Sequence, residues 1–150
     1  NLAAAREMAA HPHTMLGLGD GGAHYGMICD ASFTTFYLQN WVRDARPGEG
    51  VKLSHAIRAL TAEPARAVGL EDRGRLAPGY KADVNVIDLA RLRLHTPSVA
   101  YDLPAGGKRL RQGADGYAAT IKAGRVTYRD SEPTGALPGG LIRGAQAAPD

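Results

Sequence analysis

The sequence of 150 residues has little cysteine, few aromatic side chains and no long hydrophobic run. Its single cysteine, Cys29, excludes an internal disulfide framework and favours a reducing, cytoplasmic location. Because the apolar runs are far shorter than the ~18 residues needed to cross a bilayer, no membrane partner is expected. The net charge of +3 is spread along the chain without a Lys/Arg block, so no nucleic-acid partner is expected either.

Glycine and proline, in contrast, are abundant, with 19 and 9 residues. They indicate many turns and exclude a helical bundle or a coiled coil. With 44% hydrophobic and 22% charged residues, the composition is that of a globular protein. The sequence has no initial Met and opens in what reads as the tail of a helix, so we expect a piece of a longer chain.

Helix and strand alternate in the first part of the chain. Residues 2–10 predict the end of a helix, and the short apolar run 14–19 predicts a strand buried on both faces. That strand would end at Asp20, which Gly21 and Gly22 follow. A carboxylate at the carboxyl end of a buried strand is typical of an α/β barrel, where the chemistry takes place at that end. Asp20 is therefore the first candidate functional residue.

Two further helices are predicted before the pattern changes. Residues 31–46 hold both phenylalanines and the tryptophan at helical spacing, which favours a packed core over a substrate pocket. A second helix begins near residue 53, is interrupted at Pro64 because proline lacks the N–H donor, and stops at Gly69.

From Gly74 onward the sequence reads as strands. Residues 82–88 alternate as a strand with one buried face. Residues 117–128 predict a hairpin that turns at Ala123-Gly124. The tail from Pro133 is rich in Gly, Pro and Ala and is expected to form a surface arm or to be partly disordered.

Several motif blocks occur in one order along the chain. They are Gly17-Leu18-Gly19-Asp20-Gly21-Gly22-Ala23-His24, then Leu60-Thr61-x-x-Pro64-Ala65-Arg66-x-x-Gly69-Leu70, and then Asp72-Arg73-Gly74-x-Leu76-x-Pro78-Gly79-x-x-Ala82-Asp83-Val84-x-Val86-Ile87-Asp88. This order resembles the closing segment of the metal-dependent amidohydrolase superfamily. The later block Tyr101-Asp102-Leu103-Pro104-Ala105-Gly106-Gly107 looks most like its N-acyl-D-amino-acid deacylase (D-aminoacylase) family.

The resemblance implies an α/β fold, namely the C-terminal end of a (β/α)8 TIM barrel plus part of a small β-sandwich domain. Residues 1–70 would be the last βα unit and the terminal helices of the barrel. Residues 71–132 would be the C-terminal part of the β-sandwich, and residues 133–150 a Gly/Pro-rich tail. Because a complete barrel takes about 250 residues, most of it would lie upstream.

The resemblance also implies a function. The enzyme would hydrolyse the amide of small-molecule N-acyl-D-amino acids, with one or two zinc ions in the full-length protein. Asp20 would be the catalytic general acid/base and a possible metal ligand, with the other ligands upstream of this chain. Gly21 and Gly22 would let the substrate backbone approach, and His24 could contact substrate. The segment alone is expected to be inactive and to need the remainder of the enzyme chain or a homo-oligomer partner.

Other interpretations stay open at this point. The chain could belong to an amidohydrolase that acts on a cyclic amide or urea-like bond, or to a non-catalytic truncated module. His24 could equally be hydrogen-bonded within its own loop. His11 and His13 match the letters His-x-His but precede the strand, so a loop position away from Asp20 is expected. Cys29 reads as a small buried thiol, and the remaining two histidines, His55 and His95, as surface residues.

Overall fold

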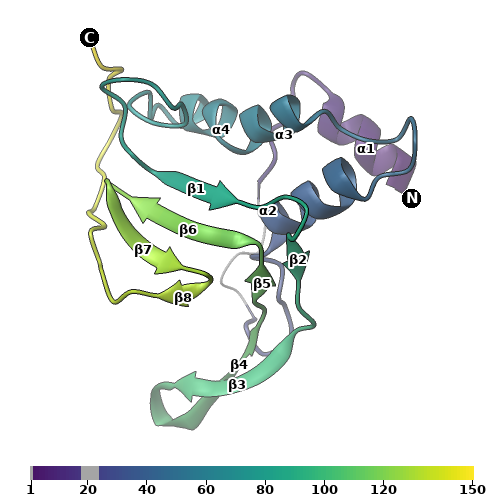
Figure 1. Ribbon diagram of the computed structural model, residues 1–150, viewed down its shortest axis with the longest axis vertical. Coiled ribbons are helices and arrows are strands. Elements are labelled where there is room, and N and C mark those ends of the chain that lie inside the picture. Colours follow the sequence, from purple (N-terminus) through teal and green to yellow (C-terminus); the bar gives the residue numbers. More distant parts are fainter. Residues whose placement is uncertain (1, 18–23) are drawn as a thin grey trace.

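The computed structural model describes residues 2–17 and 24–150. It is a mixed α/β structure in which the helices lie together on one side of the sheets (Figure 1). The helices are α1 (Leu2–Ala10), α2 (Phe33–Phe36), the π-helix η1 (Tyr37–Arg43), α3 (Leu53–Leu60) and α4 (Ala62–Ala67). None of these described helices has the length and apolar character needed to span a membrane.

The strand predicted at residues 14–19 is wrong for its described part. Residues 14–17 form no strand, and Met15 is 49% exposed. A strand buried on both faces needs a neighbouring strand at each edge, and no strand among the described residues pairs with this segment. The described part of the chain therefore contains no closed barrel, and all of its ladders between named strands are antiparallel.

The predicted helix over residues 31–46 is confirmed, with an unexpected change of geometry inside it. α2 continues directly into η1, where the Asp44 amide donates to the Gln39 carbonyl at 2.8 Å, five residues back. This helix supplies two contacts to the sheet side. The side-chain oxygen of Gln39 accepts the Leu94 amide at 2.9 Å. The Arg43 guanidinium donates to the carbonyls of Leu89, Ala90 and Leu92.

The second predicted helix is two helices, and the break lies at Thr61 rather than at Pro64. Thr61 has φ −130° and ψ −80°, outside the helical region. Pro64 lies in the first turn of α4, where an N–H has no partner within the helix and its absence costs little. The predicted stop at Gly69 is confirmed, because φ is +73° there and the Leu70 amide donates back to the Ala65 carbonyl at 2.8 Å.

One four-stranded sheet holds the strands that the sequence predicted. Its order is β1 (Val84–Ile87), β6 (Tyr117–Lys122), β7 (Arg125–Arg129) and β8 (Glu132–Pro133). The predicted hairpin is β6–β7, and its two turn residues, Ala123 and Gly124, have φ of +49° and +75°. Two positive φ values are the geometry of a type I′ turn, which matches the twist of the flanking strands.

Two smaller ribbons complete the β structure. β2 (Arg93–Leu94) pairs with β5 (Ala114–Asp115), and β3 (Ser98–Leu103) pairs with β4 (Gly107–Arg111). The tight turn η2 (Pro104–Gly106) joins β3 to β4, so the motif block 101–107 is the tip of a hairpin. This β3–β4 hairpin projects away from the helices (Figure 1).

The core lies between the helices and the turn that leads into β2. Its buried members are Tyr37, Leu38, Ala56 and Leu92. Leu92 is fully buried in that turn, and its carbonyl accepts one of the Arg43 hydrogen bonds. The core therefore depends on bringing η1 against a segment about fifty residues later in the chain.

The tail from residue 133 onward is mostly irregular, but it contacts the rest of the protein near its end. The Gln146 amide donates to the Gly69 carbonyl at 2.8 Å, and the Glu71 amide donates to the Gln146 carbonyl at 2.9 Å. This short parallel bridge between Leu70 and Gln146 places the end of the chain beside the end of α4 (Figure 1).

Candidate functional site

The predicted catalytic and substrate-contacting residues Asp20, Gly21 and Gly22 lie outside the described residues. His24 is described, and its side chain is exposed. Its backbone is left-handed, with φ of +50°, and its carbonyl accepts the Met27 amide at 2.8 Å and the Ile28 amide at 3.0 Å. His24 therefore begins a tight turn.

The segment that follows His24 is fixed to the β3–β4 hairpin. The Leu110 amide of β4 donates to the Tyr25 carbonyl at 2.7 Å. Beside this contact, Cε of Lys108 lies 4.0 Å from where a Cβ on Gly26 would be. The hairpin that carries the deacylase-like block 101–107 is thus in direct contact with the chain just after the predicted catalytic loop.

A cleft lies between this segment and β4, and we name it the 25–35/β4 cleft. Its volume is about 340 Å³. The residues that line it are Tyr25, Ile28, Cys29, Asp30, Ala31, Ser32, Thr35, Leu94, Arg109, Leu110, Arg111, Gln112 and Ala114. A second link holds its walls together, because the Ser32 hydroxyl donates to the side-chain oxygen of Gln112 at 2.6 Å. Two contacts between distant segments thus define the shape of the cleft.

Charged side chains give the cleft a definite electrostatic character. Arg109 forms a two-pronged pair with Asp102, with Nε–Oδ1 at 2.7 Å and Nη2–Oδ2 at 2.8 Å. The Arg109 hydrogen bonds hold the pKa of Asp102 below its ordinary value. Arg111 is exposed and forms no ion pair with any described residue, while Asp30 is the acidic side chain among the described lining residues.

The described residues do not provide a metal centre. Across residues 2–17 and 24–150, no group of three or more His, Cys, Asp or Glu side chains could hold a metal ion. His11 and His13 lie in the exposed turn after α1, where the His13 amide donates to Nδ1 of His11 at 3.2 Å. The expectation that they are loop residues is confirmed. Asp20, the possible ligand from this chain, lies outside the described part.

Two polar contacts were not expected from the sequence. His95 is exposed, as predicted, but its Nε2 lies 2.8 Å from Oδ1 of Asp115. The pairing of β2 with β5 brings these residues together, and that pairing rests on strands too short to recognise. The hydroxyls of Thr35 and Tyr117 lie 2.7 Å apart and join α2 to β6.

The aromatic cluster divides between core and surface. Tyr37 is 7% exposed and belongs to the core, whereas Phe36 is 45% exposed. Tyr25 and Met27 are also exposed, and Tyr25 lines the cleft. Cys29 is half-buried in the cleft wall rather than fully buried.

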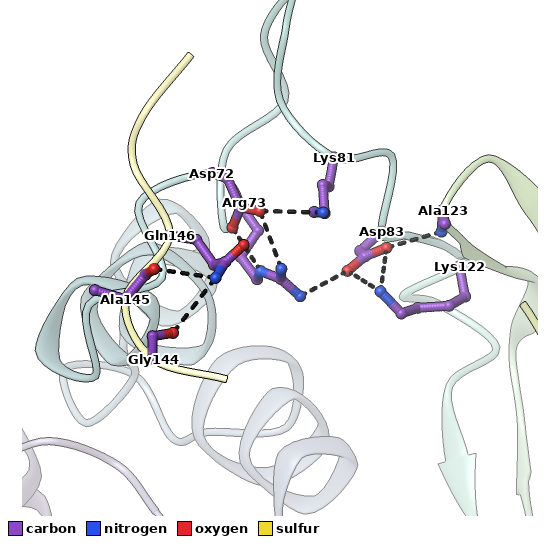
Figure 2. A network of polar contacts seen from close by, with 9 residues as sticks. All are labelled: Asp72, Arg73, Lys81, Asp83, Lys122, Ala123, Gly144, Ala145 and Gln146. Carbon is purple, nitrogen blue, oxygen red and sulfur yellow. Dashed lines mark hydrogen bonds and ion pairs between the residues drawn. The ribbon is translucent and has the colours of Figure 1, made fainter. Parts of the chain in front are cut away.

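A network of charges joins the helical part to the main sheet (Figure 2). Arg73 lies between the carboxylates of Asp72, at 2.8 Å, and Asp83, at 3.7 Å. Asp83 also accepts hydrogen bonds from Lys122 at 2.7 Å and from the Ala123 amide at 2.9 Å. The motif aspartates 72 and 83 therefore act in architecture, since they connect the end of α4, the start of β1 and the β6–β7 turn.

Replacing Asp83 by asparagine is expected to lower the free energy of unfolding by about 1 kcal/mol at pH 7. Partial burial raises the pKa of Asp83, but the hydrogen bonds from Lys122 and Ala123, with the nearby positive charges, outweigh it and lower the pKa. Because the pKa of Asp83 is lower in the folded than in the unfolded state, its charge stabilises the fold at pH values above the unfolded pKa of about 3.9. This stabilisation is lost as the pH falls through the folded-state pKa. Urea unfolding at pH 7 and pH 3 measures the difference, which should shrink at pH 3. If Asp83→Asn lowered the free energy of unfolding equally at both pH values, or if the exposed control Asp130→Asn lowered it as much, the Asp83 charge would not be the cause.

Comparison with known proteins adds to this geometry. The model of a family described as the amidohydrolase family matches residues 1–128. An N-acyl-D-glutamate deacylase from Alcaligenes xylosoxydans xylosoxydans is 44% identical over 79 residues, which are 53% of this chain and 13% of that protein. A dihydroorotase from Methanothermobacter thermautotrophicus is 38% identical over 86 residues, 55% of this chain and 19% of that protein.

An imidazolonepropionase from a Ruegeria species is 50% identical over 36 residues, 24% of this chain and 9% of that protein. The chain thus spans less than a fifth of the length of each of these relatives. No solved structure gives a significant match. Since the family model covers most of the sequence, from residue 1 to residue 128, the chain belongs to the amidohydrolase family.

Proposed function

We propose that this chain is the C-terminal portion of a hydrolase that cleaves the amide bond of N-acyl-D-amino acids. Membership of the amidohydrolase family supports a hydrolase of C–N bonds. The 44% identity to an N-acyl-D-glutamate deacylase over 79 residues is the observation that carries the substrate class. The hairpin tip formed by residues 101–107 supports the same branch and lies on the strand pair that contacts the chain after His24.

Amide hydrolysis requires that a water molecule lose a proton and that the departing nitrogen gain one. Asp20 is proposed to accept the first proton and to deliver the second. Gly21 and Gly22 would leave room for the substrate backbone beside this carboxylate, and His24 would contact the substrate. The described residues hold no group of three or more side chains that could bind the zinc that the resemblance implies, so it would need further ligands, and Asp20 is the ligand that the resemblance proposes from this chain.

A comparison of enantiomers tests the proposal on the natural full-length chain. N-acetyl-D-glutamate and N-acetyl-D-leucine should release free amino acid, and their L enantiomers should react about 10²-fold more slowly. Ninhydrin detection measures the product. A chelator such as 1,10-phenanthroline should abolish the release, and adding back Zn²⁺ should restore it. No release from any N-acyl-D-amino acid would contradict the proposed substrate class.

A cyclic amide or urea-like substrate is the second candidate. The 38% identity to a dihydroorotase over 86 residues favours it. The two substrate classes are distinguished by testing whether the full-length enzyme opens the ring of dihydroorotate or hydantoin. The loss of ultraviolet absorbance measures this reaction. Failure of both classes of substrate would favour a non-catalytic module instead.

A further inference from the structure

We propose that the 25–35/β4 cleft binds the α-carboxylate of the N-acyl amino acid and that Arg111 is the residue that recognises it. This inference rests on the proposed function, and it assigns the preference for a free carboxylate to the β3–β4 hairpin. The first argument is position. The Leu110 amide bonds to the Tyr25 carbonyl at 2.7 Å, so β4 forms one wall of the cleft and the segment just after His24 forms the other.

The second argument is charge. Arg109 has its charge balanced by Asp102 through two hydrogen bonds, whereas Arg111 adds only a smaller Coulombic attraction to Asp102 and forms no ion pair among residues 2–17 and 24–150. Arg111 therefore keeps a guanidinium whose planar donors match the two oxygens of a carboxylate. Arg111 lies on β4, and the Asp102–Arg109 pair holds β4 against the irregular part of β3.

Asp30 limits what the cleft can bind. With Asp102 and Arg109 paired, the remaining charges that line the cleft are those of Arg111 and Asp30. Their sum is zero, so recognition depends on the local geometry of one guanidinium rather than on a broad positive field. Removing the Arg111 charge would leave Asp30 uncompensated, and the cleft would then repel a carboxylate.

The size of the cleft fits a small molecule. Its volume of about 340 Å³ lies in the range of ordinary ligand pockets, about 300–1,000 Å³. Apolar side chains from both walls, including Ile28 and Leu110, accompany the polar groups. This mixture suits an amino acid that carries one carboxylate and an apolar or small side chain.

Kinetics of the natural full-length enzyme test the assignment. For Arg111→Gln, KM for N-acetyl-D-leucine should rise about 10-fold or more with little change in kcat, because a charged hydrogen bond to the substrate is lost. KM for N-acetyl-D-leucinamide, which lacks the carboxylate, should not change. Arg111→Lys should recover part of the loss, and the exposed Arg129→Gln on β7 serves as the matched control. Unchanged KM values for both substrates in Arg111→Gln would overturn the inference.

Cys29 provides a readout that needs no turnover, since it lies half-buried in the cleft wall. N-acetyl-D-leucine should slow the alkylation of Cys29 by iodoacetamide about threefold at saturation, as measured by peptide mass spectrometry. Arg111→Gln should shift this protection to about 10-fold higher substrate concentration, in line with the change in KM. Protection without hydrolysis would support the cleft and refute the proposed activity. Hydrolysis without any protection, and with Arg111→Gln at wild-type KM, would refute the cleft and leave the activity standing.

Discussion

Replacing Asp20 by asparagine should reduce hydrolysis of N-acetyl-D-amino acids by about 10²–10⁴-fold, the usual contribution of one general acid/base. Asparagine keeps the size of the side chain but can neither accept the proton of the attacking water nor return one to the nitrogen. The loss should therefore appear in kcat and in kcat/KM together, because the interaction removed belongs to the transition state. Steady-state rates of amino acid release by the full-length enzyme measure it.

The control for this experiment is Asp130→Asn. Asp130 is exposed and has φ of +48°, a backbone conformation that asparagine also tolerates, so the enzyme should keep its activity. Circular dichroism would verify that both variants fold. Activity of Asp20→Asn within threefold of the natural enzyme would refute the proposed proton transfer.

Replacing Gly116 by alanine should destabilise the protein by about 3 kcal/mol or more. Gly116 has φ of +97°, and a Cβ there would lie 2.7 Å from Cα of Leu92 and 2.8 Å from its backbone nitrogen. Leu92 is fully buried, and the atoms in the way belong to its backbone rather than to the end of a flexible side chain, so the main chain itself would have to shift. The clash would therefore disturb the packing between the helices and the turn that leads into β2. Urea unfolding of the two proteins measures the difference.

Gly124 offers a matched control at the β6–β7 turn. It also has a positive φ, +75°, but a Cβ there would meet no atom within 4 Å. Gly124→Ala should therefore cost only the backbone strain of a left-handed alanine, about 1–2 kcal/mol. If the two substitutions lowered the free energy of unfolding equally, the close approach between Gly116 and Leu92 would not be the cause.

The sequence predicted correctly those helices and turns that depend on residues close together in the chain. Residues 2–10 and the helix that begins near residue 53 follow from apolar spacing, and the stop at Gly69 from glycine's access to positive φ. The turn at Ala123-Gly124 also followed from residues that are adjacent in the chain. In each case, the interactions that determine the structure span only a few residues.

The parts that the sequence did not predict depend on distant partners. The strand at residues 14–17 is absent because an apolar run becomes a strand only when neighbouring strands pair with it. β2 and β5 are too short to have a periodicity, so the contact between His95 and Asp115 had no signal.

The candidate site shows the same division. Asp20 and His24 were predicted from a local motif, whereas the 25–35/β4 cleft had no sequence signal. Its walls come from residues near Tyr25 and near Leu110, and only the fold brings them together. A motif can identify reactive groups, but the shape of a binding surface depends on contacts between distant segments.

The bridge between Leu70 and Gln146 has a consequence for synthesis on the ribosome. Its two partners are separated by most of the second half of the chain, so α4 emerges long before the residues that pair with its end. The carbonyl of Gly69 and the amide of Glu71 must remain solvated until translation has passed Gln146. During that interval these backbone groups are open to a chaperone or a neighbouring nascent chain, and the correct contact closes only after Gln146 has left the ribosome.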